Sequence, residues 1–401
     1  MFSHDRYSLS FCSTVDFRHS PSQLSVNDEM QKIRSSLFHT DDYVSLFLNR
    51  RLLSYTFDAG ATVENLVAKG GNLMFSAYLK PKVEYKRGIV TLNVNLPMEW
   101  ERFANQPKNF FHLSPHAFLD LRTGHHSEWY MYANYLEKAG GWADFAIGNY
   151  QMDYRTTMTT NGIIPETESL NLGICYNYKR PVKEFFWSCN ADYNRSWRNT
   201  LVDMNISGGA YALKNVKHNH CSSSFSASSK LSKGFFDLHL KTLLDVNYSH
   251  SDGVQMSAGK CSDYAADVFT VSPQIAFTPK WCAVNYSADF VFNHLKTAGM
   301  DLHSLDNWAQ RLSVTGTIGR VDFTYAISYD HNELQSARDV NVLLSDFSTV
   351  LRLKKLRLEA SLRNIFNHRT YSVTSYSGIL SSTDIYQLRP REIVITAQLS
   401  L

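Results

Sequence analysis

Alternation of apolar and polar side chains, one residue at a time, is the feature that most constrains how this chain folds. It is clearest in the last stretch, where Ile393, Ile395, Ala397, Leu399 and Leu401 are apolar and the positions between them are mostly polar. A period of two indicates a strand with one apolar and one wetter face. A soluble domain seldom ends on a half-apolar edge strand, because such an edge invites aggregation. The ending therefore favours a closed barrel, in which the last strand is paired.

The same alternation recurs along the whole chain and predicts a series of strands. A first strand is expected over residues 7–17, followed by a polar stretch to about residue 40. Two-strand units are then expected at 43–48 with 53–57, 73–85 with 90–100, 111–121 with 129–135, 170–178 with 185–193, 220–231 with 236–248, 269–277 with 286–292, 312–318 with 323–329, and 342–353 with 356–362.

The connections between these strands indicate the architecture. Short turns rich in Gly, Pro, Lys and Arg alternate with long polar loops, which we expect at Glu137–Glu166, Ser196–Lys217 and Asn293–Asn307. A sandwich with Greek-key crossings has no reason to keep this rhythm, whereas an up-and-down barrel does. The sequence therefore predicts an all-β, transmembrane, up-and-down antiparallel β-barrel of about 18 strands.

Composition agrees with a strand protein and excludes two other classes. Aromatic residues make up 13% of the chain, which suits strands and interfacial girdles. The longest apolar run, 129–133, is far shorter than the roughly 20 residues that a membrane-spanning helix needs, so a membrane form of this chain would be a barrel. The net charge of +3 is too small to indicate nucleic acid as a partner.

Patterns that carry chemistry are weak in this sequence. The six cysteines form no Cys-x-x-Cys pair, and the cluster His218-Asn-His220-Cys221 has no second half at ligand spacing. His125-His126 is expected in a turn, and the serine-hydrolase, P-loop and His-Glu-x-x-His motifs are absent. We therefore expect no enzyme activity, no cofactor and no metal site. Loops on a rigid scaffold often carry function, and the loop 137–166 holds residue types that contact ligands: Trp142, Tyr150, Tyr154 and Arg155.

Two segments near the end carry a family resemblance. SLRNIFNHRTY (361–371) and YQLRPREIVITAQLSL (386–401) resemble the C-terminal end of TonB-dependent receptor barrels of the Bacteroidetes type. In that family an NLFN-like corner and an RPR-like strand start precede a terminal strand that acts as the outer-membrane sorting signal. The family usually ends on an aromatic residue, where this chain ends on Leu401. The resemblance implies that the sorting strand comprises Arg391, Ile393, Ile395, Ala397, Leu399 and Leu401.

The resemblance also implies a location, partners and a function. The chain, over residues 1–401, would be the barrel domain of a receptor in the cell outer membrane, surrounded by lipid and delivered to the barrel-assembly machinery through its terminal strand. Such receptors take up scarce nutrients, namely metal chelates, glycans or peptides, and are driven by an inner-membrane energy-coupling complex. Their barrels have about 22 strands and an N-terminal plug. A signal-peptide pattern is absent from residues 1–6, and we expect the plug, the contact with the coupling complex and about four strands in a missing N-terminal part.

Two alternatives remain at the level of sequence. The first is a porin-like or adhesin-like outer-membrane barrel of about 18 strands that works without a plug. The second is a soluble all-β protein that binds carbohydrate or has a structural role. It requires polar outward faces, whereas a membrane barrel requires an apolar band, and alternation alone does not say which way a face points.

Overall fold

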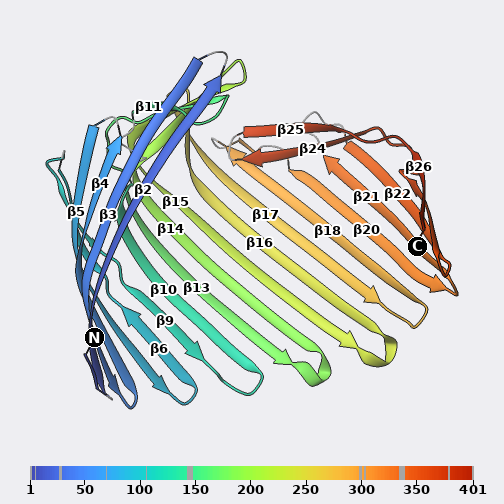
Figure 1. Ribbon diagram of the computed structural model, residues 1–401, viewed down its shortest axis with the longest axis horizontal. Helices are drawn as coiled ribbons and strands as arrows, with labels where there is room; N and C mark the ends of the chain where they lie inside the picture. Colours follow the sequence, from blue (N-terminus) through green and yellow to red (C-terminus); the bar gives the residue numbers. More distant parts are fainter. Residues whose placement is uncertain are drawn as a thin grey trace. The chain divides into compact units, whose positions relative to one another are not determined.

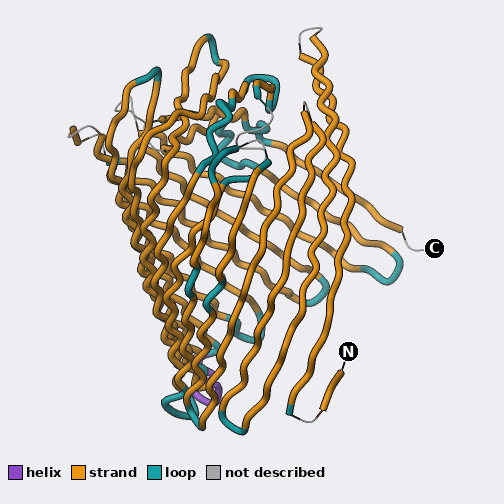
Figure 2. The backbone as a smooth tube through the Cα atoms, turned by 90° about the vertical axis from the view of Figure 1, so that its left-hand side faces the viewer, coloured by secondary structure: helices purple, strands orange, loops and turns teal. Residues whose placement is uncertain are grey.

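Strands make up nearly all of the described protein. The computed structural model describes residues 2–4, 6–26, 29–68, 70–104, 106–141, 148–297, 300–301, 304–333, 339–377 and 380–399. These residues contain 26 strands and the short 3-10 helices η1 (Pro181–Lys183) and η2 (Phe236–Leu238). Strands that follow one another pair antiparallel through short turns (Figures 1 and 2). The predicted all-β, antiparallel up-and-down architecture is confirmed. No helix in the described ranges has the length and apolarity that a membrane crossing requires.

The chain divides into two compact units. Unit 1 comprises Met1–Cys175, Asp192–Ser224 and Asp252–Asp263, and unit 2 comprises Tyr176–Ala191, Phe225–Ser251 and Tyr264–Leu401. The single barrel domain expected over residues 1–401 stays a prediction. Strands wholly in unit 1 are β1 (Phe2–His4), β2 (Tyr7–Val26), β3 (Glu29–Arg50), β4 (Leu53–Ala68), β5 (Gly70–Arg87), β6 (Val90–Asn95), β7 (Met98–Phe103), β8 (Asn109–Leu113), β9 (His116–Leu121), β10 (Ser127–Ala139), β11 (Asn149–Gln151) and β12 (Thr156–Thr159).

The remaining strands are shared between the units or belong to unit 2. Those with residues in both units are β13 (Glu166–Arg180), β14 (Phe185–Ser207), β15 (Ala210–Phe235), β16 (Leu240–Ser257) and β17 (Lys260–Phe277). Those in unit 2 are β18 (Cys282–Thr297), β19 (Met300–Asp301), β20 (Leu305–Ile318), β21 (Val321–Glu333), β22 (Asp339–Arg352), β23 (Leu356–Arg363), β24 (Thr370–Ser377), β25 (Leu380–Gln387) and β26 (Glu392–Leu399).

The polar stretch expected between residues 18 and 40 is instead the far half of a long hairpin. Strand β2 continues to Val26, and β3 begins at Glu29 and pairs with it along its whole length. The expectation was wrong because polar side chains do not end a strand whose backbone groups are paired across the ladder. Here Asp16 lies opposite His39 and Val15 opposite Thr40. Figure 1 shows the two strands running side by side in blue.

Two of the expected long loops are also largely strand. Within the expected loop 196–217, β14 runs to Ser207 and β15 starts at Ala210. The turn consists of Gly208 and Gly209, with φ of 56° and 82°. Two successive residues with positive φ make the tight hairpin turn whose twist matches the flanking strands, so no long loop is needed. Within the expected loop 293–307, β18 runs to Thr297 and β20 starts at Leu305.

The strand count exceeds the expected value of about 18 for a local reason. Strands β6 and β7 both pair with β5. On their other side, β6 pairs with β9 and β7 pairs with β8. Pro97 separates β6 from β7, and Pro115 separates β8 from β9. Proline has no N–H to donate to a ladder, so each break divides one expected strand into two. The short strands β1, β11, β12 and β19 were not expected either, nor was the hairpin of β24 and β25, where a long loop was expected.

In unit 1 a glycine makes room for a tyrosine that crosses a strand. Gly60 on β4 lies opposite Tyr43 on β3 and Tyr78 on β5. A Cβ at Gly60 would lie 2.6 Å from the Tyr43 Cβ and 2.7 Å from the Tyr78 hydroxyl oxygen. The Tyr78 hydroxyl donates to Asp41 Oδ1 at 2.7 Å, and Tyr78 is only 8% exposed. The missing side chain thus lets Tyr78 reach across β4 to a carboxylate on β3.

We expect Gly60→Ala to destabilise the protein. The added methyl group must displace Tyr43 or Tyr78, and overpacking of this kind costs about 1–3 kcal/mol. Gly124→Ala is the matched control, because a Cβ there meets only the Ser127 hydroxyl at 3.4 Å. Urea unfolding followed by circular dichroism measures both. Equal midpoints for the two variants would contradict the packing described for Gly60.

Candidate functional site

Unit 2 contains a sheet with one polar and one apolar face. Successive side chains of a strand point to opposite faces, so residues directly opposite one another on paired strands share a face. Across β17, β18, β20, β21 and β22, one polar row is Gln274, Ser287, Arg311, Ser328 and Leu344, and the next on that face is Ala276, Asn285, Ser313, Ala326 and Asp346. The row between them, on the other face, is Ile275, Tyr286, Leu312, Ile327 and Ser345.

The described residues leave the apolar face largely uncovered. Phe269 and Phe292 stack on each other with centroids 6.2 Å apart, yet each is 40% exposed, as is Phe347. Further along the same face, Ile393 and Ile395 on β26 are 73% and 76% exposed. An apolar surface that continues over several strands indicates a contact with something apolar.

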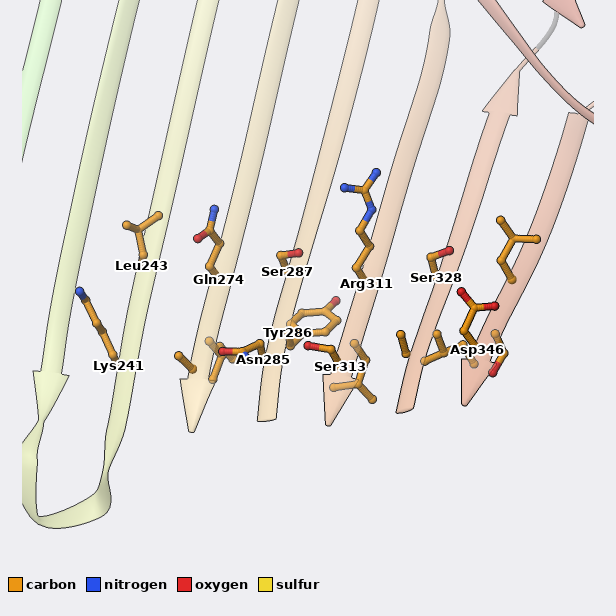
Figure 3. A pocket seen from close by; sticks show the side chains of 17 residues that line it. Lys241, Leu243, Gln274, Asn285, Tyr286, Ser287, Arg311, Ser313, Ser328 and Asp346 are labelled. Carbon is orange, nitrogen blue, oxygen red and sulfur yellow. The ribbon is translucent and has the colours of Figure 1, made fainter. Parts of the chain in front are cut away.

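The polar rows line a hollow, which Figure 3 shows from close by. Its volume is about 650 Å³. Charged groups in its lining are Lys241 on β16, Arg311 on β20 and Asp346 on β22, and the other labelled side chains, apart from Leu243, carry hydroxyl or amide groups. Cations, an anion and neutral hydrogen-bonding groups together suit water or a polar solute. An apolar ligand would leave these groups without partners.

Asp346 connects this lining to the corner that follows β23. Its Oδ1 accepts the backbone N–H of Asn364 at 2.8 Å. Asn364 and Asn367 both have left-handed backbone conformations, with φ of 49° and 56°. Asparagine adopts this conformation more readily than most residues, which explains why two asparagines bound the turn Asn364-Ile-Phe-Asn367.

The two asparagines fasten this corner to the start of the last strand. The Asn364 side-chain amide donates to the carbonyl oxygens of His368 and Arg389, each at 2.7 Å, and its Oδ1 accepts the His368 N–H at 3.0 Å. Asn367 Oδ1 accepts the backbone N–H of Arg391 at 3.0 Å. The corner and the Arg389-Pro-Arg391 segment, singled out in the sequence as one motif, are therefore one hydrogen-bonded unit, which we call the terminal clasp.

Of the predicted sorting residues, Arg391 belongs to the terminal clasp and the others follow it. Arg391 precedes β26, which pairs antiparallel with β23 from Glu392 to Leu399. Ile393, Ile395, Ala397 and Leu399 lie opposite Leu362, Ala360, Leu358 and Leu356, and Leu362 in turn lies opposite Phe347, which places them on the apolar face. Leu401 lies outside the described residues. The sorting role itself stays a prediction.

The loop expected to contact ligands contains a small hairpin in unit 1. Tyr150 lies on β11 opposite Met158 on β12, and β12 pairs in parallel with β15. In the turn, the Asp153 carboxylate accepts the backbone N–H groups of Arg155 and Thr156 at 2.7 and 2.9 Å. These bonds, that from Arg155 first, hold the pKa of Asp153 below its ordinary value. Trp142 lies outside the described residues, and ligand binding by this loop stays a prediction.

Tyr154 and Arg155 interact with each other at the tip of the small hairpin. Tyr154 is 66% exposed, and the Arg155 guanidinium lies 5.0 Å from the centre of its ring. A cation above an aromatic face is a weak attraction at an exposed site, about 0.5–1 kcal/mol. Both side chains are exposed, so they remain accessible from solvent.

The histidine motifs of the sequence do not converge on a common centre. His218 Nε2 lies 3.5 Å from Cys261 Sγ, whereas His220 Nδ1 is bound to the His218 carbonyl oxygen and Cys221 Sγ to Arg195 Nε. His125 and His126 are exposed in the turn between β9 and β10, as expected.

The structure brings together one group that the sequence reasoning missed. Among the described residues, His331, Glu333 and Asp339 are the one set of three potential metal ligands whose donor atoms all lie within 4.8 Å of one another. They flank the connection between β21 and β22. Their spacing matches no short motif, because the hairpin register, and not the sequence distance, makes them neighbours.

Among known proteins, this chain shows similarity only to solved structures. No family model and no curated protein matches the chain. A mutant of the ferric enterobactin receptor PfeA from Pseudomonas aeruginosa is 7% identical with a TM-score of 0.35, covering 100% of this chain and 81% of that one. The copper transporter OprC is 7% identical with a TM-score of 0.36, covering 100% and 82%. The ferric yersiniabactin uptake receptor FyuA from Yersinia pestis is 8% identical with a TM-score of 0.37, covering 98% and 68%. At these values the likeness assigns no residue, ligand or partner to this chain.

Proposed function

We propose that this chain forms the wall of an outer-membrane β-barrel of the TonB-dependent-receptor type, which takes up a nutrient and is not an enzyme. The observation that carries the proposal is the pair of faces in unit 2. One face carries exposed Phe and Ile side chains, and the other carries Lys241, Arg311 and Asp346 beside amides and hydroxyls. Lipid on the first face and water or a polar solute on the second satisfy both.

The exposed apolar side chains favour contact with lipid on energetic grounds. Burial of one Phe, Leu or Ile side chain is favourable by about 1.5–3 kcal/mol, so a broad apolar face in water forgoes many such contributions. Hydrocarbon around the apolar face supplies this burial without any further protein element. The alternative of a soluble all-β protein requires polar exposed faces, and Ile393 and Ile395, each more than 70% exposed, argue against it.

The height of the apolar face fits the same proposal. On β21 it runs from Val321 through Phe323, Tyr325 and Ile327 to Tyr329, and His331 and Glu333 follow. These nine residues, at about 3.3 Å each and a tilt of about 40°, give a height of about 23 Å. Outer-membrane barrels have an apolar band about 25 Å tall with aromatic residues at its borders, and Tyr329 occupies such a border position.

The finer parts of the proposal rest on the resemblance of residues 361–371 and 386–401. It suggests a receptor of the Bacteroidetes type, a metal chelate, glycan or peptide as the solute, insertion by the barrel-assembly machinery through β26, and energy coupling through a further N-terminal part. The terminal clasp supports treating the two segments as one structural unit. The positively charged lining around Lys241 and Arg311 also suits a porin-like barrel, which is the second candidate.

Site-directed labels on neighbouring positions of β18 test the membrane location. In a variant with the six native cysteines replaced, we expect a spin label at Phe292→Cys to be reached by oxygen dissolved in lipid and shielded from a water-soluble nickel complex. A label at Asp289→Cys, which the alternation puts on the opposite face, should show the reverse. Electron paramagnetic resonance of the bilayer-reconstituted protein measures both. Equal access of the nickel complex to both positions would sink the proposal.

Charge reversal in the lining tests whether ions pass along the polar face. Arg311→Glu replaces a cation with an anion in the hollow, so we expect the current across a planar bilayer to shift toward cations. Arg320→Glu makes the same change in net charge in the turn between β20 and β21 and serves as the control. Reversal potentials in a salt gradient measure the selectivity. A shift of the same size in both variants would mean that Arg311 does not face the conduction path.

Loss of the terminal clasp tests the role of the last strand in assembly. Asn364→Gly keeps the left-handed backbone accessible but removes the side-chain bonds to His368 and Arg389, at an expected cost of about 1–3 kcal/mol. We expect a smaller fraction of heat-modifiable, protease-resistant protein in outer-membrane preparations. Asn247→Ala, which removes one exposed bond to Asp245, is the control. A normal yield of assembled Asn364→Gly protein would show that the clasp is dispensable.

A further inference from the structure

The group His331, Glu333 and Asp339 lies at the loop ends of β21 and β22, strands that are orange in Figure 1. Glu333 lies directly opposite Asp339, and His331 lies opposite both Trp308 on β20 and Asn341 on β22. Residues 331 and 333 share a face, as do 339 and 341, so the three side chains point to the same side of the sheet. They come immediately after Tyr329, where the apolar face ends.

The His331 imidazole is held in one orientation. It is only 7% exposed, and its ring stacks on Trp308 with centroids 3.8 Å apart and planes 10° apart. Its Nδ1 lies 2.7 Å from Asn341 Oδ1, an oxygen that also accepts the Tyr329 hydroxyl at 2.7 Å. An amide oxygen only accepts, so Nδ1 donates this bond, and in the neutral imidazole Nε2 then holds the lone pair. A histidine whose second nitrogen is bound in this way is typical of metal ligands.

The two carboxylates are placed where a cation is needed. Like charges directly opposite on paired strands destabilise a sheet, and Glu333 and Asp339 form such a pair. Glu333 Oε2 accepts the backbone N–H of Asp306 at 2.9 Å, which fixes the carboxylate and leaves Oε1 available. Within the described part of the chain, neither Glu333 nor Asp339 forms an ion pair with a basic side chain.

We propose that His331, Glu333 and Asp339 bind a divalent transition-metal ion of the zinc class, which joins the loop ends of β21 and β22. One imidazole nitrogen and two carboxylate oxygens are ligands that Zn²⁺ accepts at about 2.0–2.2 Å, with water in the remaining position. One donor atom of each of the three residues lies within 4.8 Å of the others. Magnesium and calcium prefer oxygen-only sites, so the imidazole favours the zinc class. The site does not depend on the transport function proposed above.

Titration of the metal-stripped full-length protein with zinc chloride, followed by calorimetry, tests the proposal. We expect one site per chain and a loss of affinity of at least tenfold for His331→Ala and for Asp339→Asn. Asp339 is exposed at the start of β22, so Asp339→Asn provides a test that does not depend on a buried side chain. The double variant His218→Ala/His220→Ala is the control, because the structure assigns those histidines to other contacts, and it should bind zinc as the native chain does.

A thermal measurement separates a built site from surface binding. Zinc should raise the midpoint of heat unfolding of the native protein and not of Asp339→Asn, because an ion bound only to the folded state stabilises it. Asn341→Ala, which frees the imidazole to rotate, should weaken zinc binding while keeping both carboxylates. Equal zinc affinity in the native protein and in Asp339→Asn would overturn the site. Tighter binding of calcium than of zinc would overturn the assigned class of metal.

Discussion

Backbone pairing between neighbouring strands is the constraint on which the rest of this structure depends. Tyr286 pairs with Leu312, and Leu312 pairs with Ile327. Because side chains alternate between the two faces, these pairs fix the face of all the remaining residues on the three strands. A slip of one residue would place Arg311 among the exposed phenylalanines and bring apolar side chains into the polar hollow. The apolar face, the hollow and the carboxylates at the loop ends therefore share one cause, which is the register of β17 to β22.

The sequence could predict strands and turns wherever alternation was strict, and it failed where side-chain polarity was taken to mark a loop. Alternation from Phe323 to Tyr329 predicted β21, which begins two residues earlier, at Val321. Polar residues are frequent in the segments 18–40 and 196–217, which therefore looked like loops, yet the backbone groups of the described residues there are paired in long hairpins. The side chains of a strand that is wet on both faces carry no period-2 signal. In such a segment the clearest available signal was the turn, Gly208-Gly209.

The candidate sites divide in the same way. The two segments of the terminal clasp were singled out by their family resemblance, whereas the hydrogen bonds that join them were not predicted. The metal ligands could not be found, because His331, Glu333 and Asp339 come from two strands and meet only through the pairing of Glu333 with Asp339. The motif His218-Asn-His220-Cys221, which was not taken as a metal site, illustrates the converse. Its residues are close in sequence, but each contacts a different partner.

The position of the metal ligands follows from the end of the apolar face. Up to Tyr329 the face of β21 carries side chains that suit hydrocarbon, and from His331 onward it carries groups that need water or a counter-ion. Two carboxylates directly opposite each other, as in Glu333 and Asp339, destabilise the end of a hairpin unless a cation lies between them. Trp308 and Asn341 hold the His331 imidazole in one orientation. A strand end that is only solvated would gain nothing from a fixed ring. This combination of repulsion and orientation distinguishes the group from an ordinary polar strand end.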